Sequence, residues 1–190
     1  MIRGNLMSLK VNTDLIKRAQ QGDLETIGGL YETYHLSVYR FLFYRVGDRA
    51  AAEDLTSEVF LRMLRFISGF NPPSASFQAW LFQIARNLAI DHHRRMSVRN
   101  HLPLEEKLAA RGEHLDAAVE RSLTSESLQA ALAELNDEQR DVILMRFIAE
   151  MPIAEVAKAL HKSENSIKGL QRRALSALRE VLIDWEINYE

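Results

Sequence analysis

Cysteine is absent from the 190-residue sequence, which excludes disulfides and thiolate metal sites. The absence also fits a reducing compartment, so we expect a cytoplasmic protein. No apolar run approaches the roughly 18 residues needed to span a bilayer, and the first residues contain no apolar core of signal-peptide length. Glycine and proline are scarce, with 8 and 4 residues, and period-two alternation is rare. These features predict an all-α protein with no membrane insertion.

The sequence also has no large excess of charge of either sign, because its 24 Lys and Arg residues nearly balance its 26 Asp and Glu residues. On such a chain a local basic patch marks a defined surface, whereas a uniformly basic chain would only attract nucleic acid without specificity. Residues 158–179 contain one anion, Glu164, and six cations: Lys158, Lys162, Lys168, Arg172, Arg173 and Arg179. This segment is therefore the candidate nucleic-acid contact.

The segment 151–182 has the pattern of two helices joined by a short turn. Ser163 is a favourable N-cap for the second helix because its hydroxyl accepts a free backbone N–H. One face of that helix is apolar and comprises Ile167, Leu170, Ala174, Leu178 and Val181. The opposite face carries Asn165, Lys168, Gly169, Arg172, Ser176 and Arg179. This pattern predicts a helix-turn-helix, in which the first helix braces the second against the major groove. A helical hairpin with a merely solvated basic face is the alternative.

The first half of the chain predicts four helices, over residues 15–20, 24–46, 50–67 and 77–96. Pro72-Pro73 forces a loop within residues 68–76, and Ser76 is placed to cap the fourth helix. Gly28-Gly29 lies inside the second helix, where each glycine is unfavourable by roughly 1 kcal/mol. A close helix contact or a local break would explain the pair.

Three features of this half have more than one interpretation. The charged sides of the 50–67 helix fit either a solvated face or a docking face for a partner helix. Phe77 and Trp80, with cations further along their helix, fit either the core or a surface that stacks unpaired bases. Asp91-His92-His93 resembles a metal-binding triplet, but consecutive helix residues point about 100° apart and no second cluster completes a site. We therefore expect no metal and no cofactor.

Residues 98–124 break the helical pattern with Pro103, Gly112 and five acidic residues. We predict a flexible linker here, between small helical domains at residues 1–97 and 125–190. If extended, such a linker could span at most ~90 Å, which exceeds two turns of B-DNA. The two domains could then occupy well-separated sites on one duplex.

The second domain is expected to open with an apolar stripe formed by Leu128, Leu132 and Leu135. Asn136 then caps the next helix, with Gln139 in the capping-box position. The apolar side of that helix is expected to comprise Val142, Ile143, Met145 and Phe147. The acidic tail after Leu182 is expected to fray.

Two separate stretches resemble one family. Residues 51–66 (AAEDLTSEVFLRMLRF) and 76–95 (SFQAWLFQIARNLAIDHHRR) are similar to the second conserved region of bacterial sigma factors, and residues 132–182 to the fourth region. The two-domain layout resembles the extracytoplasmic-function (ECF) group. A lone helix-turn-helix would be a weak signal, whereas two independent motifs in the right order are specific.

The resemblance implies a promoter-recognition subunit of RNA polymerase, with roles for individual residues. The residues implied to dock on the clamp coiled coil of the largest polymerase subunit are Asp54, Leu55, Glu58, Val59 and Arg62. Those implied to capture and hold the −10 element are Phe70, Asn71, Ser76, Arg86, Asn87, Asp91, Arg94 and Arg95. Those implied to bind the −35 element are Ser163, Asn165, Ser166, Lys168, Arg172 and Arg173. The resemblance further implies contact with the polymerase flap and an anti-sigma partner.

The sequence departs from the family pattern at several positions, one of which has a backbone consequence. His161 replaces the glycine usual in the turn of the helix-turn-helix, so residue 161 is expected to need a left-handed backbone at some cost. Two other functions remain as alternatives. One is an autonomous helix-turn-helix regulator that binds operators as a dimer, and the other is a metal phosphodiesterase built on Asp91-His92-His93.

Overall fold

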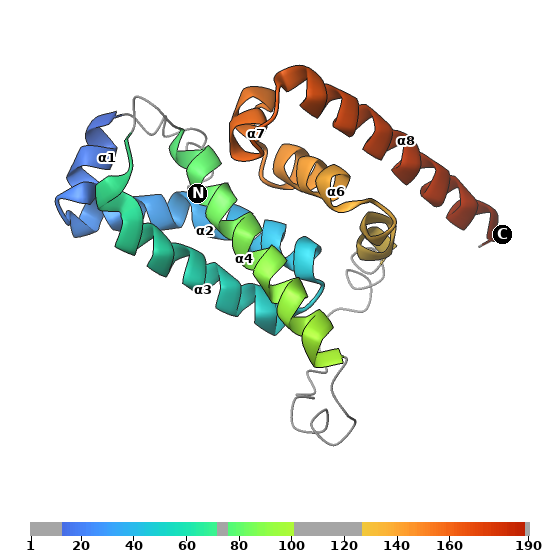
Figure 1. The fold of residues 1–190 in the computed structure, drawn as a ribbon, viewed down its shortest axis with the longest axis horizontal. Helices are drawn as coiled ribbons and strands as arrows, with labels where there is room; N and C mark the ends of the chain where they lie inside the picture. The colour runs from blue at the N-terminus through green and yellow to red at the C-terminus, as the bar shows by residue number, and fades with distance from the viewer. Residues whose placement is uncertain (1–12, 72–75, 101–126, 189–190) are drawn as a thin grey trace, which may run out of the picture.

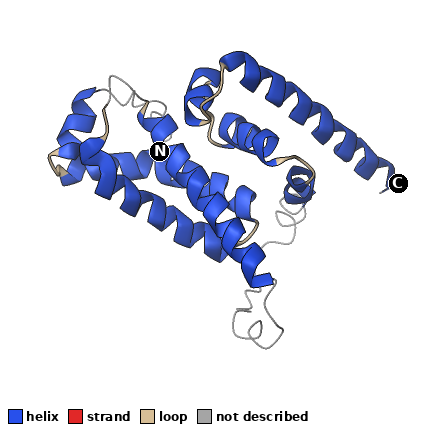
Figure 2. Ribbon diagram, in the orientation of Figure 1, coloured by secondary structure: helices blue, strands red, loops and turns tan. Residues whose placement is uncertain are grey.

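The structure is a computed structural model that describes residues 13–71, 76–100 and 127–188. All regular elements within these residues are helices, as predicted (Figure 2). No helix in the described ranges is long and apolar enough to cross a membrane. Residues 1–12, the Pro72-Pro73 loop and most of the expected linker lie outside the described residues.

The front unit, residues 13–71 and 76–100, is built from three long helices, one short α-helix and one 3-10 turn (Figure 1). Its elements are α1 (Thr13–Gln20), α2 (Leu24–Val46), α3 (Arg49–Phe66), η1 (Ile67–Gly69) and α4 (Phe77–Asn100). Helices α2, α3 and α4 pack against one another, and their inner faces bury Phe41, Val59 and Phe82 completely. Helix α4 continues beyond the predicted end at Met96, because no helix breaker occurs before Pro103.

Gly28 and Gly29 of α2 mark neither a local break in the helix nor a close contact with another helix, which were the two explanations expected from the sequence. The helix runs unbroken from Leu24 to Val46. A Cβ added at Gly28 or at Gly29 would meet no atom within 4 Å, so no neighbouring helix approaches closely there. Nothing in the structure requires glycine at these two positions.

Replacing Gly28 by alanine is therefore expected to stabilise the protein by about 0.5–1 kcal/mol, because alanine loses less backbone entropy in a helix. Gly47→Ala provides the control, because Gly47 ends the same helix with a φ of 79°, where a Cβ introduces strain. Urea unfolding should show opposite signs for the two variants. Destabilisation by Gly28→Ala would contradict the prediction.

The rear unit, residues 127–188, contains the helix-turn-helix. Residues 127–133 are helical and are followed by α6 (Asp137–Ile143), η3 (Leu144–Ile148), α7 (Ile153–Ala159) and α8 (Glu164–Asn188). The predicted capping box is confirmed, because Asn136 accepts from the Gln139 N–H and the Gln139 side chain accepts from the Asn136 N–H. The expected fraying after Leu182 is wrong, since α8 continues to Asn188.

Phe147 departs from the predicted apolar face of its helix. Val142, Ile143 and Met145 are buried as expected, but Phe147 is 49% exposed. The backbone explains the difference, because η3 is a π-turn in which the Ala149 N–H donates to the Leu144 carbonyl, five residues earlier. The wider turn shifts the side-chain register relative to an α-helix.

The two units pack against each other. Helix α7 lies against α4, and η3 lies against α2 (Figure 1). The buried apolar side chains of both units form one continuous cluster. Helix α8 lies on the outer side of the rear unit, so its exposed face points away from the front unit.

Candidate nucleic-acid interface

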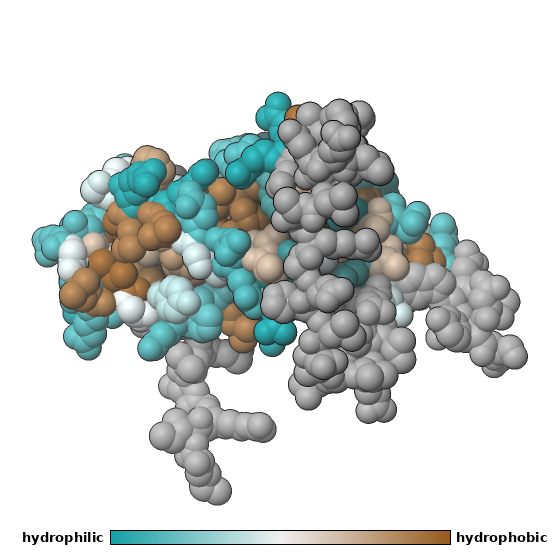
Figure 3. Space-filling view, turned by 90° about the horizontal axis from the view of Figure 1, so that it is seen from below, coloured by the Kyte–Doolittle hydropathy of each residue, from teal (hydrophilic) through white to brown (hydrophobic). Residues whose placement is uncertain are grey.

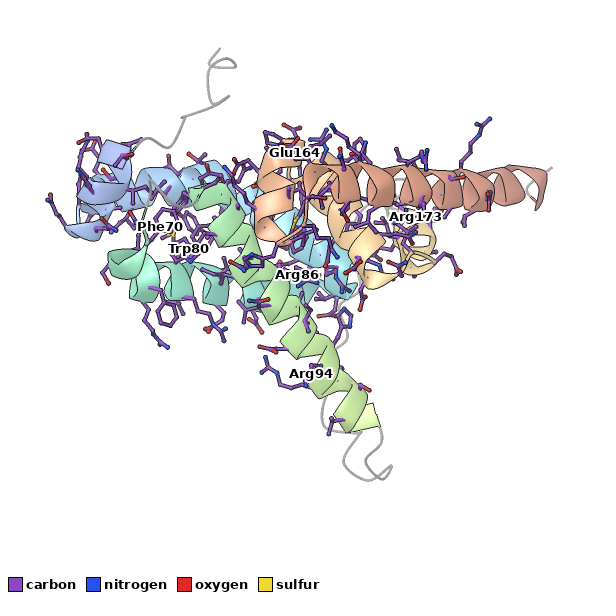
Figure 4. All side chains as sticks on the ribbon, turned by 45° about the horizontal axis from the view of Figure 1, so that its top comes forward. Phe70, Trp80, Arg86, Arg94, Glu164 and Arg173 are labelled. Atoms are coloured by element: carbon purple, nitrogen blue, oxygen red, sulfur yellow. The ribbon has the colours of Figure 1, made fainter. Side chains whose placement is uncertain are left out.

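Helix α8 presents the predicted basic face to solvent (Figure 4). Ile167, Leu170 and Ala174 are buried against the rest of the rear unit, which fixes the rotation of the helix. The predicted −35 residues are all exposed: Ser163, Asn165, Ser166, Lys168, Arg172 and Arg173. We call Lys168, Arg172 and Arg173 the α8 cations. Their charges lie on a surface that nothing in the described part of the chain covers.

The turn before α8 has the geometry that the sequence predicted. Ser163 caps the helix, because its Oγ accepts from the Ser166 N–H at 3.2 Å. His161 adopts a left-handed backbone with a φ of 52°, as expected for a position where the family has glycine. The Lys162 N–H closes the turn on the Ala157 carbonyl at 2.9 Å. The turn is therefore built without glycine, at the cost of one strained residue.

A second polar row runs along α4. Asn87, Asp91, Arg94 and Arg95 are exposed and recur at spacings of three and four, so they share one side of the helix. Arg86 differs from them, because its Nε donates to the Asp141 carboxylate of α6 at 2.6 Å. Figure 4 shows Arg86 beside the rear unit and Arg94 near the far end of α4. Four of the predicted −10 residues thus lie together on α4, whereas the fifth, Arg86, is bound to Asp141 of the rear unit.

Phe70 is a core residue rather than an exposed one. It is buried and packs on Phe77 and Trp80, with ring centroids 5.9 and 4.9 Å away. Its carbonyl accepts from the Gln20 side chain at 2.7 Å. Phe77 is also buried, so the core interpretation of this residue is confirmed. The aromatic cluster anchors the start of the loop that leads to α4.

The two other predicted residues of this loop lie at its ends. Asn71 is exposed at the point where the described chain stops before the prolines. Ser76 caps α4 as predicted, since its Oγ accepts from the Ala79 N–H at 3.4 Å. A base pocket between them would involve residues 72–75, which lie outside the described residues.

The predicted docking residues on α3 divide between two faces. Asp54, Glu58 and Arg62 lie at the surface, and Arg62 donates to Glu58 at 2.7 Å. Leu55 and Val59 are buried, so their side chains support the helix from the core side. The motif alone could not separate the faces, although the spacing of Leu55, Val59, Met63 and Phe66 indicated an inward stripe. Phe66 is the exception, because its side chain is 54% exposed at the end of α3.

Sequence reasoning missed the apolar part of this α3 surface. Leu61 is 58% exposed, and Leu64 is 44% exposed. Leu61 follows Glu58 by three residues, so the two share a face. Figure 3 shows apolar surface gathered toward the end of the front unit where α3 finishes. We call Asp54, Glu58, Leu61 and Arg62 the α3 face. A mixed apolar and charged surface of this kind is typical of protein contacts.

Asp91-His92-His93 takes no part in a metal-like cluster. No group of three His, Asp or Glu side chains with ligand geometry occurs in the described ranges. His93 instead donates from Nε2 to the Arg45 carbonyl at 2.9 Å, at the end of α2. Burial is the main cause of a lowered pKa of His92, and the charge of the neighbouring His93 lowers this pKa further. The hydrogen bond of His93 thus joins α4 to the end of α2.

Comparison with known families matches both units. Residues 30–99 match the model of sigma-70 region 2, and residues 131–180 match the model of sigma-70, region 4. Both conserved regions of a sigma-70-type protein are thus present in one chain, which favours a sigma factor over an autonomous regulator.

Curated relatives narrow the family. The ECF RNA polymerase sigma factor BldN of Streptomyces coelicolor is 40% identical over 173 residues, which cover 90% of this chain and 66% of BldN. The ECF RNA polymerase sigma factor SigX of Bacillus subtilis is 35% identical over 189 residues, which cover 87% of this chain and 92% of SigX. The chain belongs to the ECF sigma factors, the small sigma-70-type proteins that direct RNA polymerase to promoters.

Solved structures show the same fold. CnrH, in complex with the cytosolic domain of CnrY, matches with a TM-score of 0.72 at 21% identity, over 90% of this chain and 96% of that chain. The sigma factor RpoE from Bartonella quintana, in complex with the anti-sigma factor NepR, matches with a TM-score of 0.63 at 20% identity, over 87% and 97% of the two chains. At these identities the likeness concerns the fold.

Proposed function

We propose that the two units of this sigma factor divide promoter recognition between them. The rear unit binds the −35 element through α8, and the front unit grips the polymerase through α3 and holds the opened −10 element along α4. One observation supports this proposal: the α8 cations and the α3 face lie on different units of one chain, and both reach the surface, although Glu58 and Arg62 of the α3 face are half-buried. Each surface can therefore serve a different partner.

The α8 surface has the chemistry that a major groove requires. Arginine can bind guanine edges in a bidentate manner, and lysine and arginine both contact phosphates. Asn165 and Ser166 lie in the first turn of α8, and Ser163 caps it, so their polar groups sit where recognition helices contact DNA. The −35 preference then depends on which of these side chains reach base edges.

The polar row of α4 fits a strand whose bases have been separated. Arg94 and Arg95 can neutralise phosphates, and Asn87 and Asp91 can hydrogen-bond exposed base edges. Asn71 and Ser76 flank the segment that we propose takes up a flipped base. Unstacking a base costs a few kcal/mol, which contacts in such a pocket offset. Phe70 contributes by fixing the loop from the core.

The α3 face is the proposed contact with the clamp coiled coil of the largest polymerase subunit. Leu61 supplies apolar area, while Asp54, Glu58 and Arg62 supply charges of both signs. Leu55 and Val59 hold this face in place from the core. The rear unit is the proposed contact with the polymerase flap.

The other predicted properties belong to the same proposal. Residues 1–97 and 125–190 act as the two functional domains, with a linker over residues 98–124. The protein acts in the cytoplasm as a binding subunit that uses no cofactor and carries out no catalysis of its own. We also propose an anti-sigma partner, since CnrH and RpoE were both solved in complex with partner proteins.

Reconstitution with core RNA polymerase tests the proposal. Core enzyme plus this chain should co-purify and should produce specific run-off transcripts from a subset of genomic promoters, whereas core enzyme alone should not. Promoter fragments should bind the free chain only weakly, since the chain is nearly neutral overall and polymerase fixes both units at the promoter. Tight operator binding as a dimer without polymerase, together with no transcript, would support the autonomous regulator instead.

A further inference from the structure

The contact between the two units contains a buried three-residue bridge. Asp141 of α6 is fully buried, and its two carboxylate oxygens are shared between two arginines of the front unit. Oδ1 accepts from Arg45 Nε of α2 at 2.9 Å, and Oδ2 accepts from Arg86 Nε of α4 at 2.6 Å. Arg45 also donates from Nη2 to Asp137 at 2.9 Å. We call Arg45, Asp141 and Arg86 the Asp141 bridge.

The bridge makes docking of the units an all-or-none event. A buried carboxylate is costly unless it is paired and hydrogen-bonded, and here every partner of Asp141 that forms an ion pair comes from the other unit. Partial separation would leave Asp141 and Arg45 buried without their partners. Complete separation returns both charges to water. The bridge therefore favours two discrete arrangements, closed and open.

Further contacts between the units are consistent with a specific closed state. Gln83 of α4 hydrogen-bonds the His161 ring, and Gln78 reaches the Ala149 carbonyl at 3.5 Å. Tyr34 of α2 is buried near Glu155 of α7, and burial raises the pKa of Tyr34 to about 12, with Glu155 adding to the effect. Tyr34 is thus neutral at ordinary pH and adds no charge to the contact.

In the closed state the two proposed DNA-binding surfaces lie too close together to contact both promoter elements. From the Gln83–His161 contact, the rise of α4 and of α8 places Arg95 and Arg173 at most roughly 55 Å apart. The −10 and −35 elements are about 25 base pairs apart, which is ~85 Å of B-DNA. The closed state also holds Arg86, one of the proposed −10 residues, on Asp141. Promoter binding by both units thus requires separation.

We propose that the Asp141 bridge is an autoinhibitory latch that holds the free chain closed, and that its release both separates the units and frees Arg86 for DNA. The inference rests on the proposed function, because it requires that Arg86 binds promoter DNA when the two units are separated. In the closed state the guanidinium binds the carboxylate of Asp141. In the open state it binds the promoter.

Fluorescence energy transfer in the full chain tests the latch without polymerase or DNA. The chain has no cysteine, so Glu32→Cys on α2 and Glu180→Cys on α8 would be the only labelling sites. Transfer should be high in the otherwise unchanged chain. Asp141→Asn should lower it by shifting the closed-to-open ratio roughly a hundredfold, because Arg45 would lose its buried counter-ion. Arg45→Gln should produce the same open state from the other side of the contact.

Glu138→Gln is the matched control for Asp141→Asn. Glu138 lies on the same helix and pairs with Lys162 at 2.8 Å inside the rear unit, so its loss changes the charge equally without touching the bridge. Transfer in this variant should remain high. Far-UV circular dichroism verifies that each variant is folded. Unchanged transfer in a folded Asp141→Asn or Arg45→Gln variant would overturn the latch, as would equal opening in Glu138→Gln.

A reversible cross-link tests whether closure inhibits. Gln83→Cys and His161→Cys, joined by a short bis-maleimide with a reducible disulfide, would fix the contact between α4 and α7. The linked chain should bind core polymerase but initiate at less than a tenth of the rate that returns after reduction. Equal initiation before and after reduction would refute inhibition by closure. Failure of the reduced and unmodified chains alike would instead refute the proposed function.

Discussion

Replacing Arg172 and Arg173 together by alanine is expected to lower the affinity of the reconstituted polymerase for its promoter roughly a hundredfold. Both side chains are exposed on the α8 surface, and the helix is fixed beneath them by buried Ile167 and Ala174. The loss should therefore come from DNA contacts, with the fold preserved. Binding of the chain to core polymerase should change little. A mobility-shift titration of the holoenzyme on a promoter fragment measures the effect.

Lys17→Ala with Arg40→Ala is the matched control for this pair. Both residues are exposed cations on the front unit, so the net charge changes equally while the α8 surface stays intact. The control should retain promoter affinity within a few fold. The salt dependence of binding then shows whether the lost side chains contacted phosphates, since each lost phosphate contact should lower the slope of log K against log salt by about 0.9. Equal losses in both double variants would show that α8 has no special role.

Leu61→Asp is expected to weaken binding to core polymerase at least tenfold. The substitution places a charge in the apolar part of the α3 face, where desolvation makes an unpaired carboxylate unfavourable. The side chain is largely exposed, so stability should change little. Competition between this chain and a fluorescent sigma factor for core enzyme measures the loss.

Leu36→Asp is the control for Leu61→Asp, because Leu36 is a similarly exposed leucine on α2 and lies outside the α3 face. It should compete for core enzyme as the unchanged chain does. A Leu61→Asp variant that is folded and competes with full strength would remove α3 from the polymerase contact.

Local patterns predicted most of the helices and their caps. Asn136, Ser76 and Ser163 cap helices where the sequence placed them, because capping depends on residues within one turn. The left-handed backbone of His161 was likewise predicted, because His161 replaces the glycine that the family usually has at this turn position. The exposure of the α8 cations followed from the period of the apolar residues beneath them.

Features that depend on the packing of distant segments were missed. Phe70 was expected to contact DNA but is buried, because its neighbours in the aromatic cluster come from the far side of the Pro72-Pro73 loop. The π-turn that exposes Phe147 has no sequence signature. No sequence pattern singled out Asp141, because its partners lie 96 and 55 residues away.

The most direct test of the division between the units is site-directed DNA cleavage within one polymerase–promoter complex. An iron chelate that generates hydroxyl radicals would be attached either at Glu164→Cys, where α8 begins, or at Met96→Cys, near the end of α4. We expect cuts around the −35 element from the first position and around the −10 element from the second, about 25 base pairs apart. Cuts at one common position from both sites, or none upstream from α8, would contradict it.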